Sequence, residues 1–155
     1  MSKISKHLFV GTRHESDFHF FREKSSKLPL MCYHNFPVEF FPIVSLFAED
    51  CDFNIYELYA DDGRLFIKGR NRKREGAKTN DFMLRYGDKR LVVARVQFVN
   101  QRKGNMSKLY LYLKAIRKRY KLDKIIIECC NIEGMRNWCV KNGFVRMVGN
   151  SYIEK

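Results

Sequence analysis

Long apolar runs are absent from this chain of 155 residues. No apolar stretch reaches the ~18 residues that a membrane-spanning helix requires. The basic start, Met1 to His7, leads only into the run Leu8-Phe9-Val10, which is too short for a secretory signal. These features predict a soluble, intracellular protein of cytoplasmic localisation without a membrane partner.

The cysteines are odd in number, and their spacing suggests no pairing. The five cysteines are Cys32, Cys51, Cys129, Cys130 and Cys139, and no Cys-x-x-Cys occurs. All four histidines lie in the first quarter of the chain, so a zinc site would need scattered partners. The sequence therefore predicts reduced thiols and no metal site.

Acidic residues are few beside basic ones, since 17 Asp and Glu stand against 30 Lys and Arg, a formal net charge of +13. Such an excess attracts polyanions over long distances. Nucleic acid, ribosomes and acidic proteins are therefore candidate partners, and the alternative is a basic protein that is merely soluble. The adjacent acids Asp61-Asp62 lie in a predicted turn, which disfavours a metal-dependent nuclease.

Hydrophobic residues make up 45% of the chain and aromatic residues 14%, enough for a substantial core. The length fits a single domain over residues 1–155. Internal repeats and low-complexity tracts are not evident. Disorder over most of the chain is therefore not expected.

The stretch Val92 to Ser107 is the most informative part of the sequence. Its first half is apolar and β-branched, which is typical of a buried strand. A polar loop with Gly104 follows, and apolar residues then recur at helical spacing from Met106. A loop that leads into a helix N-terminus can cradle a phosphate, because the first N–H groups have no partner within the helix. A plain strand-to-helix turn remains the alternative.

The remaining pattern predicts an alternation of strands and helices. Strands are expected at 6–12, 53–59, 65–68, 81–86, 91–99 and 124–130, with helices at 15–27, at 38–48 beginning near Pro42, from 106, and within 131–144. A last hairpin is expected from 145–148 and 151–153. The basic segment 69–80 is interpreted as a solvated hairpin loop, with phosphate contact as the alternative.

Two motifs resemble the GNAT superfamily of N-acetyltransferases. Gln101-x-x-Gly104 matches that family's coenzyme A loop at the end of its fourth strand, although Met106 replaces the family's last Gly or Ala. At the family's spacing, Asn131 then precedes a short helix and Gly143-Phe144. The resemblance covers residues 91–148. It implies an α/β (α+β mixed) GNAT-like fold, with a central, mostly antiparallel mixed sheet flanked by helices.

The resemblance also implies function. It predicts transfer of an acyl group from acetyl-CoA (coenzyme A) to an amine-bearing substrate. Backbone groups of Val96 to Val99 would hold the pantetheine and polarise the carbonyl. Met106 is expected to crowd or shift the pyrophosphate, and Asn131 either contacts coenzyme A or caps the following helix. The predicted cofactor-binding residues are Phe98, Val99, Gln101, Arg102, Lys103, Gly104, Asn105, Met106, Ser107 and Asn131.

The catalytic residues are harder to assign. The strand that should carry a glutamate base has none, so Glu57 and His34 are the substitutes, unless the acceptor amine needs no strong base. Cys139 stands where the family often has its tyrosine acid, with Tyr110 and Tyr152 as alternatives. The competing hypothesis is a catalytically inactive protein of this fold that binds nucleic acid or a protein partner through its basic surface. Family members often dimerise, so a homodimer is a further expectation.

Overall fold

A computed structural model describes residues 38–52, 54–61, 64–71, 78–101, 103–128 and 130–155. The strand and the helix expected before residue 38, and the candidate base His34, lie outside the described residues. The elements are a 3-10 turn η1 (Val38–Phe40), helices α3 (Phe41–Asp50), α4 (Asn105–Arg119) and α5 (Glu133–Lys141), and strands β1 (Ile55–Asp61), β2 (Arg64–Asn71), β3 (Lys78–Gly87), β4 (Arg90–Gln97), β5 (Lys124–Ile127), β6 (Phe144–Arg146) and β7 (Tyr152–Glu154).

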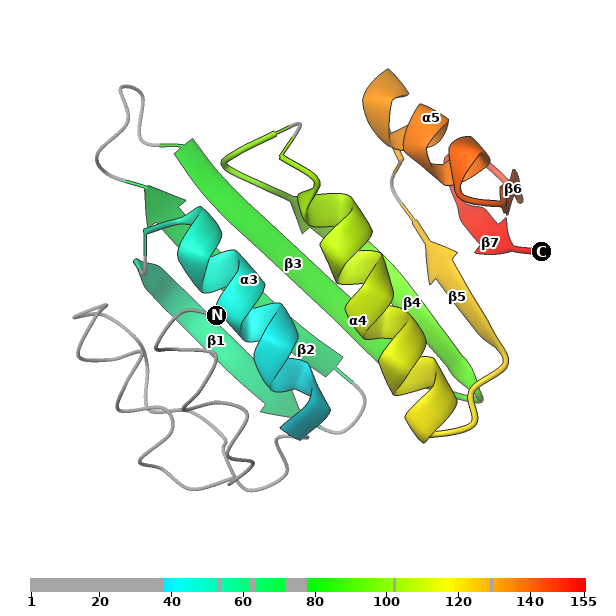
Figure 1. The fold of residues 1–155 in the computed structure, drawn as a ribbon, viewed down its shortest axis with the longest axis horizontal. Helices are drawn as coiled ribbons and strands as arrows, with labels where there is room; N and C mark the ends of the chain where they lie inside the picture. Colours follow the sequence, from blue (N-terminus) through cyan, green and yellow to red (C-terminus); the bar gives the residue numbers. More distant parts are fainter. Residues whose placement is uncertain (1–37, 53, 62–63, 72–77, 102, 129) are drawn as a thin grey trace.

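The described strands form one seven-stranded sheet in the order β1-β2-β3-β4-β5-β7-β6. Neighbouring strands are antiparallel except β4 and β5, which are parallel and joined by α4 (Figure 1). A parallel pair needs a long crossover, and α4 supplies it. The predicted mixed, mostly antiparallel sheet with helices is confirmed.

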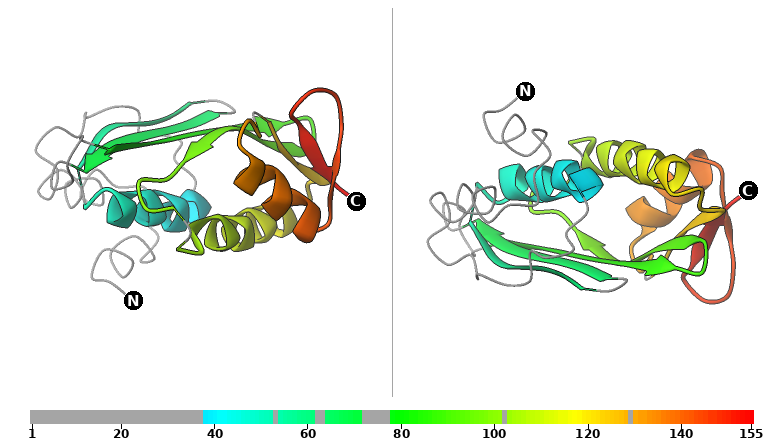
Figure 2. Two further views of the ribbon diagram at one scale, coloured as in Figure 1. Left: turned by 90° about the horizontal axis from the view of Figure 1, so that it is seen from above. Right: turned by 90° about the horizontal axis from the view of Figure 1, so that it is seen from below.

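The core lies between the sheet and the helices. In α4 the buried residues Met106, Leu109, Leu113 and Ile116 recur every three or four positions, which places one apolar stripe against the sheet. β5 is apolar on both sides, and Ile125, Ile126 and Ile127 are all buried. Helices α3 and α4 lie side by side over one face of β1–β4, and α5 lies at the β5–β7 end (Figure 2).

Most predicted elements within the described residues are confirmed, with shifts at their ends. The helix predicted from Met106 begins at Asn105, and Pro42 lies in the first turn of α3. The prediction of a loop over 69–80 is wrong at both ends, because β2 extends to Asn71 and β3 begins at Lys78. There Arg70 pairs in register with Thr79, and Asn71 with Lys78. Among the residues that the structure describes, no helix has the length and apolarity needed to cross a membrane.

Candidate functional site

Strands β4 and β5 separate partway along their length. They pair in register from Arg90 with Lys124 to Val93 with Ile127, and the Glu128 N–H then donates to the Val93 carbonyl at 2.8 Å. On the other side of β4, Met83 pairs with Arg95 and Leu84 with Val93, so Ala94 is an extra residue in the ladder. Such a bulge bends a strand and increases its twist. The second half of β4 is therefore turned away from β5.

The chain after β5 leaves β4 because it has other partners. The predicted strand over 124–130 ends at Ile127, and the Cys130 N–H donates to the Asn150 carbonyl at 2.9 Å. The Asn150 amide donates to the Asn131 side-chain oxygen at 3.0 Å, and Arg136 donates to the Cys130 carbonyl at 3.1 Å. The C-terminal hairpin and α5 thus hold this segment apart from β4.

The separation leaves backbone groups of β4 directed toward the gap. In a strand, successive residues direct their side chains to opposite faces of the sheet and their N–H and C=O groups to opposite edges. Two residues whose side chains lie on the same face therefore direct their N–H and C=O groups to the same edge. Val93 has its side chain in the core and its carbonyl toward β5. The Val96 side chain also packs against the core, so its N–H and C=O point to the same edge. At that position β5 is no longer paired with β4.

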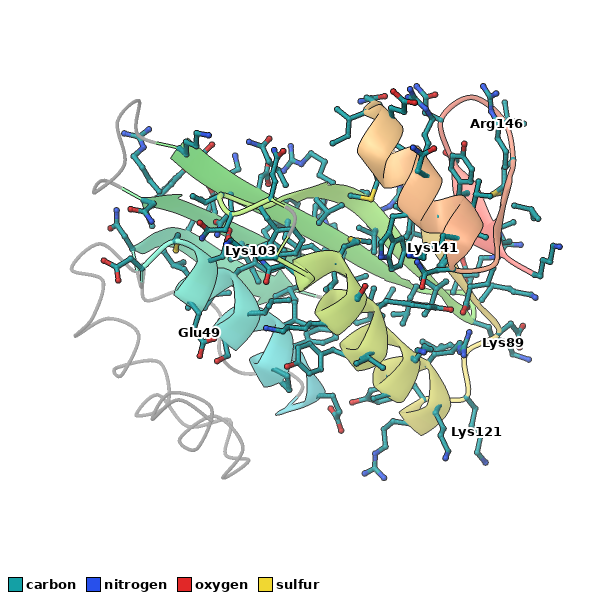
Figure 3. The ribbon with its side chains drawn as sticks, turned by 45° about the horizontal axis from the view of Figure 1, so that its top comes forward. Glu49, Lys89, Lys103, Lys121, Lys141 and Arg146 are labelled. Carbon is teal, nitrogen blue, oxygen red and sulfur yellow. The ribbon has the colours of Figure 1, made fainter. Side chains whose placement is uncertain are left out.

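The same strand leads into the N-terminus of α4. Gly104 is the N-cap residue, with φ of 74°, and no side chain caps the helix. The first turn contains no acidic residue, and a Cβ at Gly104 would meet nothing within 4 Å. The first N–H groups of α4 carry the positive end of the helix dipole without a side-chain acceptor. Lys103, which is exposed, adds positive charge in the preceding loop (Figure 3).

A buried carboxylate at the end of α3 fixes the loop between β4 and α4. Asp50 is only 4% exposed, and it accepts hydrogen bonds from the Val99 N–H at 2.7 Å and the Asn100 N–H at 2.9 Å. The side-chain amides of Asn80 and Asn100 donate to it at 3.0 and 3.2 Å. Sequence reasoning missed Asp50, whose only signal is a carboxylate at the end of an apolar helix.

This arrangement corrects one expectation and qualifies another. The Val99 N–H donates to Asp50, so it does not polarise a ligand carbonyl, and Val96 is the better placed of the expected residues. Met106 does not crowd the loop, because its side chain belongs to the hydrophobic core. Only its backbone remains at the helix N-terminus, where a larger side chain brings no steric penalty.

The other predicted cofactor-binding residues divide into supports and exposed groups. Phe98 stacks on Phe47 with ring centres 4.7 Å apart, and the Asn105 amide donates to Asp50 and to the Asn100 carbonyl. These two residues therefore hold the loop from inside. The exposed groups, which can face a ligand, are Gln101, Lys103, Gly104 and Ser107, whereas Arg102 lies outside the described residues.

Helix α5 is tied to the first turn of α4. The Trp138 Nε1–H donates to the Ser107 hydroxyl at 3.1 Å, and the Trp138 and Tyr110 rings meet edge-on at 5.5 Å. Asn131 precedes the N-cap residue Ile132, and no side chain caps α5 there, so the capping alternative for Asn131 is wrong. α5 and α4 therefore stand beside the gap between β4 and β5 as one packed unit.

Cys139 is unsuited to the role of proton donor. Its side chain is fully buried, with its sulfur 3.8 Å from that of Cys130. The hydrogen bond with Cys130, together with burial, raises the pKa of the Cys139 thiol, whereas the same contact lowers the pKa of Cys130. A buried thiol with a raised pKa neither reaches nor readily protonates a departing thiolate.

The remaining acid and base candidates are not gathered at the gap. Glu57 forms an ion pair with Lys68 at 3.8 Å on β1–β2, and β1 lies three strands, about 14 Å, from β4. The Tyr110 hydroxyl donates to Glu154 at 2.6 Å, and Tyr152 is buried in the core. The structure therefore does not bring Glu57 and Cys139 into one catalytic group.

Comparison with known proteins adds little detail. No protein-family model matches the chain, and no curated protein matches it. Among solved structures, PaiA N-acetyltransferase from Thermoplasma acidophilum in complex with coenzyme A is similar to it, with a TM-score of 0.43 and 14% identity over 96% of this chain and 89% of that one.

Proposed function

We propose that this protein is an acyl-CoA-dependent N-acyltransferase, with acetyl-CoA as donor and an amine as acceptor. The observation that carries the proposal is the separation of β4 from β5 after Val93, beside a helix N-terminus that lacks a side-chain cap. The Gln101-x-x-Gly104 motif, through which the sequence resembles the GNAT superfamily, lies between these two features.

The donor groups fit the chemistry of coenzyme A. The first N–H groups of α4 and Lys103 form a set for a pyrophosphate, because both carry positive charge and the helix end has no side-chain acceptor. The C=O of Val96 suits an amide N–H of the pantetheine arm, which leaves the Val96 N–H for the acyl carbonyl. Asp50 contributes indirectly, since it holds the backbone of Val99 and Asn100 and so fixes the path of the loop.

Acyl transfer does not require a side-chain base if the acceptor amine is already unprotonated. Acetyl-CoA supplies an activated acyl group, and the Val96 N–H would polarise its carbonyl. No carboxylate occurs between Arg90 and Gln97. The site therefore suits an amine of low pKa, such as that of an aminoacyl ester, which attacks without a strong base.

The first test is a calorimetric titration with acetyl-CoA. We expect micromolar binding to the wild type and its loss in Gly104→Trp, whose indole would fill the open space at the helix N-terminus. Gly143→Trp is the matched control, because Gly143 also has a positive φ, of 83°, and open space around it. Equal loss in both variants would point to backbone strain. Absence of binding to the wild type would refute the proposal.

A second candidate is a protein that binds acyl-CoA without turnover. It is favoured by the burial of Cys139 and the separation of Glu57 from the gap. The two candidates differ in product formation, so acetyl-CoA would be incubated with aminoacyl ester and simple amine acceptors and the products weighed by mass spectrometry. Acetylated product above the uncatalysed rate supports the enzyme, and tight binding with none supports the binding protein.

A further inference from the structure

The sheet face opposite the helices carries a concentrated group of arginines. Arg64 of β2 pairs in register with Arg85 of β3, and Phe66 pairs with Met83, which pairs with Arg95 of β4. Arg90 lies at the start of β4 on the same face. We call the group of Arg64, Phe66, Arg85, Arg90 and Arg95 the arginine face. Its members come from three neighbouring strands and so form one continuous surface.

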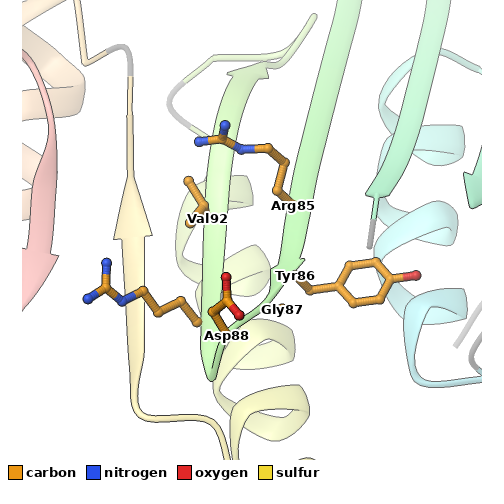
Figure 4. A pocket seen from close by; sticks show the side chains of 6 residues that line it. Arg85, Tyr86, Gly87, Asp88 and Val92 are labelled. Carbon is orange, nitrogen blue, oxygen red and sulfur yellow. The ribbon is translucent and has the colours of Figure 1, made fainter. Parts of the chain in front are cut away.

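The arginine face is open to solvent. Both views in Figure 2 place α3 and α4 on the other side of the sheet, and Figure 4 shows Arg85 and Val92 on the side turned away from α4. The Arg85 and Arg95 side chains are 46% and 45% exposed. Arg64 and Arg90 are exposed as well. A large ligand could therefore approach without moving a described helix.

Acidic residues offset part of the charge on this face, and Asp61 of β1 pairs in register with Arg64. Arg64 and Arg85 are direct cross-strand partners, an arrangement of like charges that destabilises a sheet. Glu128 pairs with Arg85 at 2.6 Å, and Asp81 lies 3.5 Å from Arg95. These exposed ion pairs contribute little to stability and exchange readily with other anions.

Phe66 adds a stacking surface among these charges. The guanidinium groups of Arg64 and Arg95 lie 5.9 and 6.0 Å from its ring centre. A hollow of about 530 Å³ opens nearby on the same side of the sheet, and Arg85, Arg90 and Val92 are among its lining residues (Figure 4). The face thus combines groups for phosphates with planar groups for bases.

We propose that the arginine face binds single-stranded nucleic acid. Arg64, Arg85 and Arg90 contact successive phosphates, and a base stacks beside Phe66. A sheet face presents aromatic and guanidinium planes to unpaired bases, whereas reading a duplex requires an element that enters a groove. An acidic peptide would match the charge but would leave the stacking surface unused. This inference goes beyond the proposed acyl transfer and uses the opposite side of the sheet.

Fluorescence anisotropy with labelled 15-mers of U and dT, titrated from 50 to 300 mM salt, tests the proposal. The test variant combines Arg64→Gln with Arg90→Gln. The matched control combines Lys118→Gln with Lys141→Gln, which removes the same charge from exposed positions on α4 and α5. We expect at least tenfold weaker binding for the test variant, a salt slope reduced by about 1.4, and less than threefold change for the control. The U and dT arms show whether RNA is preferred over DNA.

Phe66→Leu separates stacking from charge, and we expect about tenfold weaker binding with an unchanged salt slope. Thermal melting and acetyl-CoA titration of every variant verify that the fold and the β4–α4 site are intact. Equal losses in the test and control variants would overturn the proposal. The proposal would also be overturned if a duplex or polyglutamate bound as tightly as the 15-mers. Absence of binding of the 15-mers to the wild-type protein would overturn it as well.

Discussion

Asp50 and Glu154, two buried carboxylates of the described chain, lie at different ends of α4 and have different partners. Asp50 is 4% exposed and Glu154 is 8% exposed. Glu154 pairs with Arg117 and accepts hydrogen bonds from the Tyr110 hydroxyl and from the Ile125 N–H at 2.9 Å. The donors to Asp50 are backbone N–H groups and asparagine amides.

The different partners give the two carboxylates different roles: Glu154 stabilises the fold, and Asp50 fixes the loop of the candidate site. Glu154 links α4 to β5 and β7, elements that would meet without it because their apolar faces pack in one core. Asp50 instead orders an irregular loop, whose backbone N–H groups have no strand to pair with. A buried N–H without an acceptor is costly, so the loop depends on this one carboxylate.

Asp50→Asn should have the largest effect. The substituted amide places an NH2 group against donors from Val99, Asn100 and Asn80, so we expect unfolding to become easier by about 3 kcal/mol. Acetyl-CoA affinity should fall further than stability alone explains. Chemical denaturation and calorimetry measure both, with the exposed neighbour variant Glu49→Gln as control. Unchanged affinity in a folded Asp50→Asn protein would show that the loop does not bind coenzyme A.

Glu154→Gln should cost less, about 2 kcal/mol, because the variant keeps an acceptor for Ile125 but loses the charge opposite Arg117. Acetyl-CoA affinity should stay within twofold, since these contacts lie away from the loop. A comparable loss of affinity in this variant would remove the distinction between the two carboxylates.

The pH dependence of the wild type should report on Glu154. Burial pushes its pKa up, but hydrogen bonds from Tyr110, Arg117 and Ile125 outweigh burial and hold the pKa below its ordinary value of 4.5. A lowered pKa in the folded state gives stability that is present above pH 4.5 and lost as the pH falls. Denaturation of Glu154→Gln should therefore show a flatter slope in this acid range than the wild type does.

Tyr110→Phe should have the smallest effect, about 1 kcal/mol at neutral pH from one lost hydrogen bond. Burial and the Glu154 contact raise the pKa of Tyr110 to about 12. Because the folded protein then holds this proton more tightly, stability should fall as the pH rises from about 10 toward 12. The fall should be weaker in the variant, and equal slopes would contradict the raised pKa.

Regular elements with a clear apolar period were predictable from the sequence. The stripe of α4 and the apolar run of β5 identified a helix and a buried strand. The irregular features were not. Ala94 is a residue type that also occurs at paired strand positions, so its identity does not mark a bulge. It is the extra residue because Met83 pairs with Arg95 and the next residue, Leu84, pairs with Val93.

The candidate site was predictable only in part. The loop with Gly104 was found from its place between a strand and a helix, and Met106 was misjudged because the direction of its side chain was unknown. Asp50 was missed because it lies 49 residues from Val99 in the chain, and no local pattern connects them.

The sequence by itself determined the basic charge, the succession of strands and helices, and the loop before α4. These depend on composition and on local periodicity, which each segment carries alone. Only the tertiary structure decided where β4 and β5 separate, which N–H groups Asp50 occupies, and which arginines share one face. These depend on pairing between residues far apart in the chain, because a hydrogen bond or a like-charge contact exists only once the strands are in register.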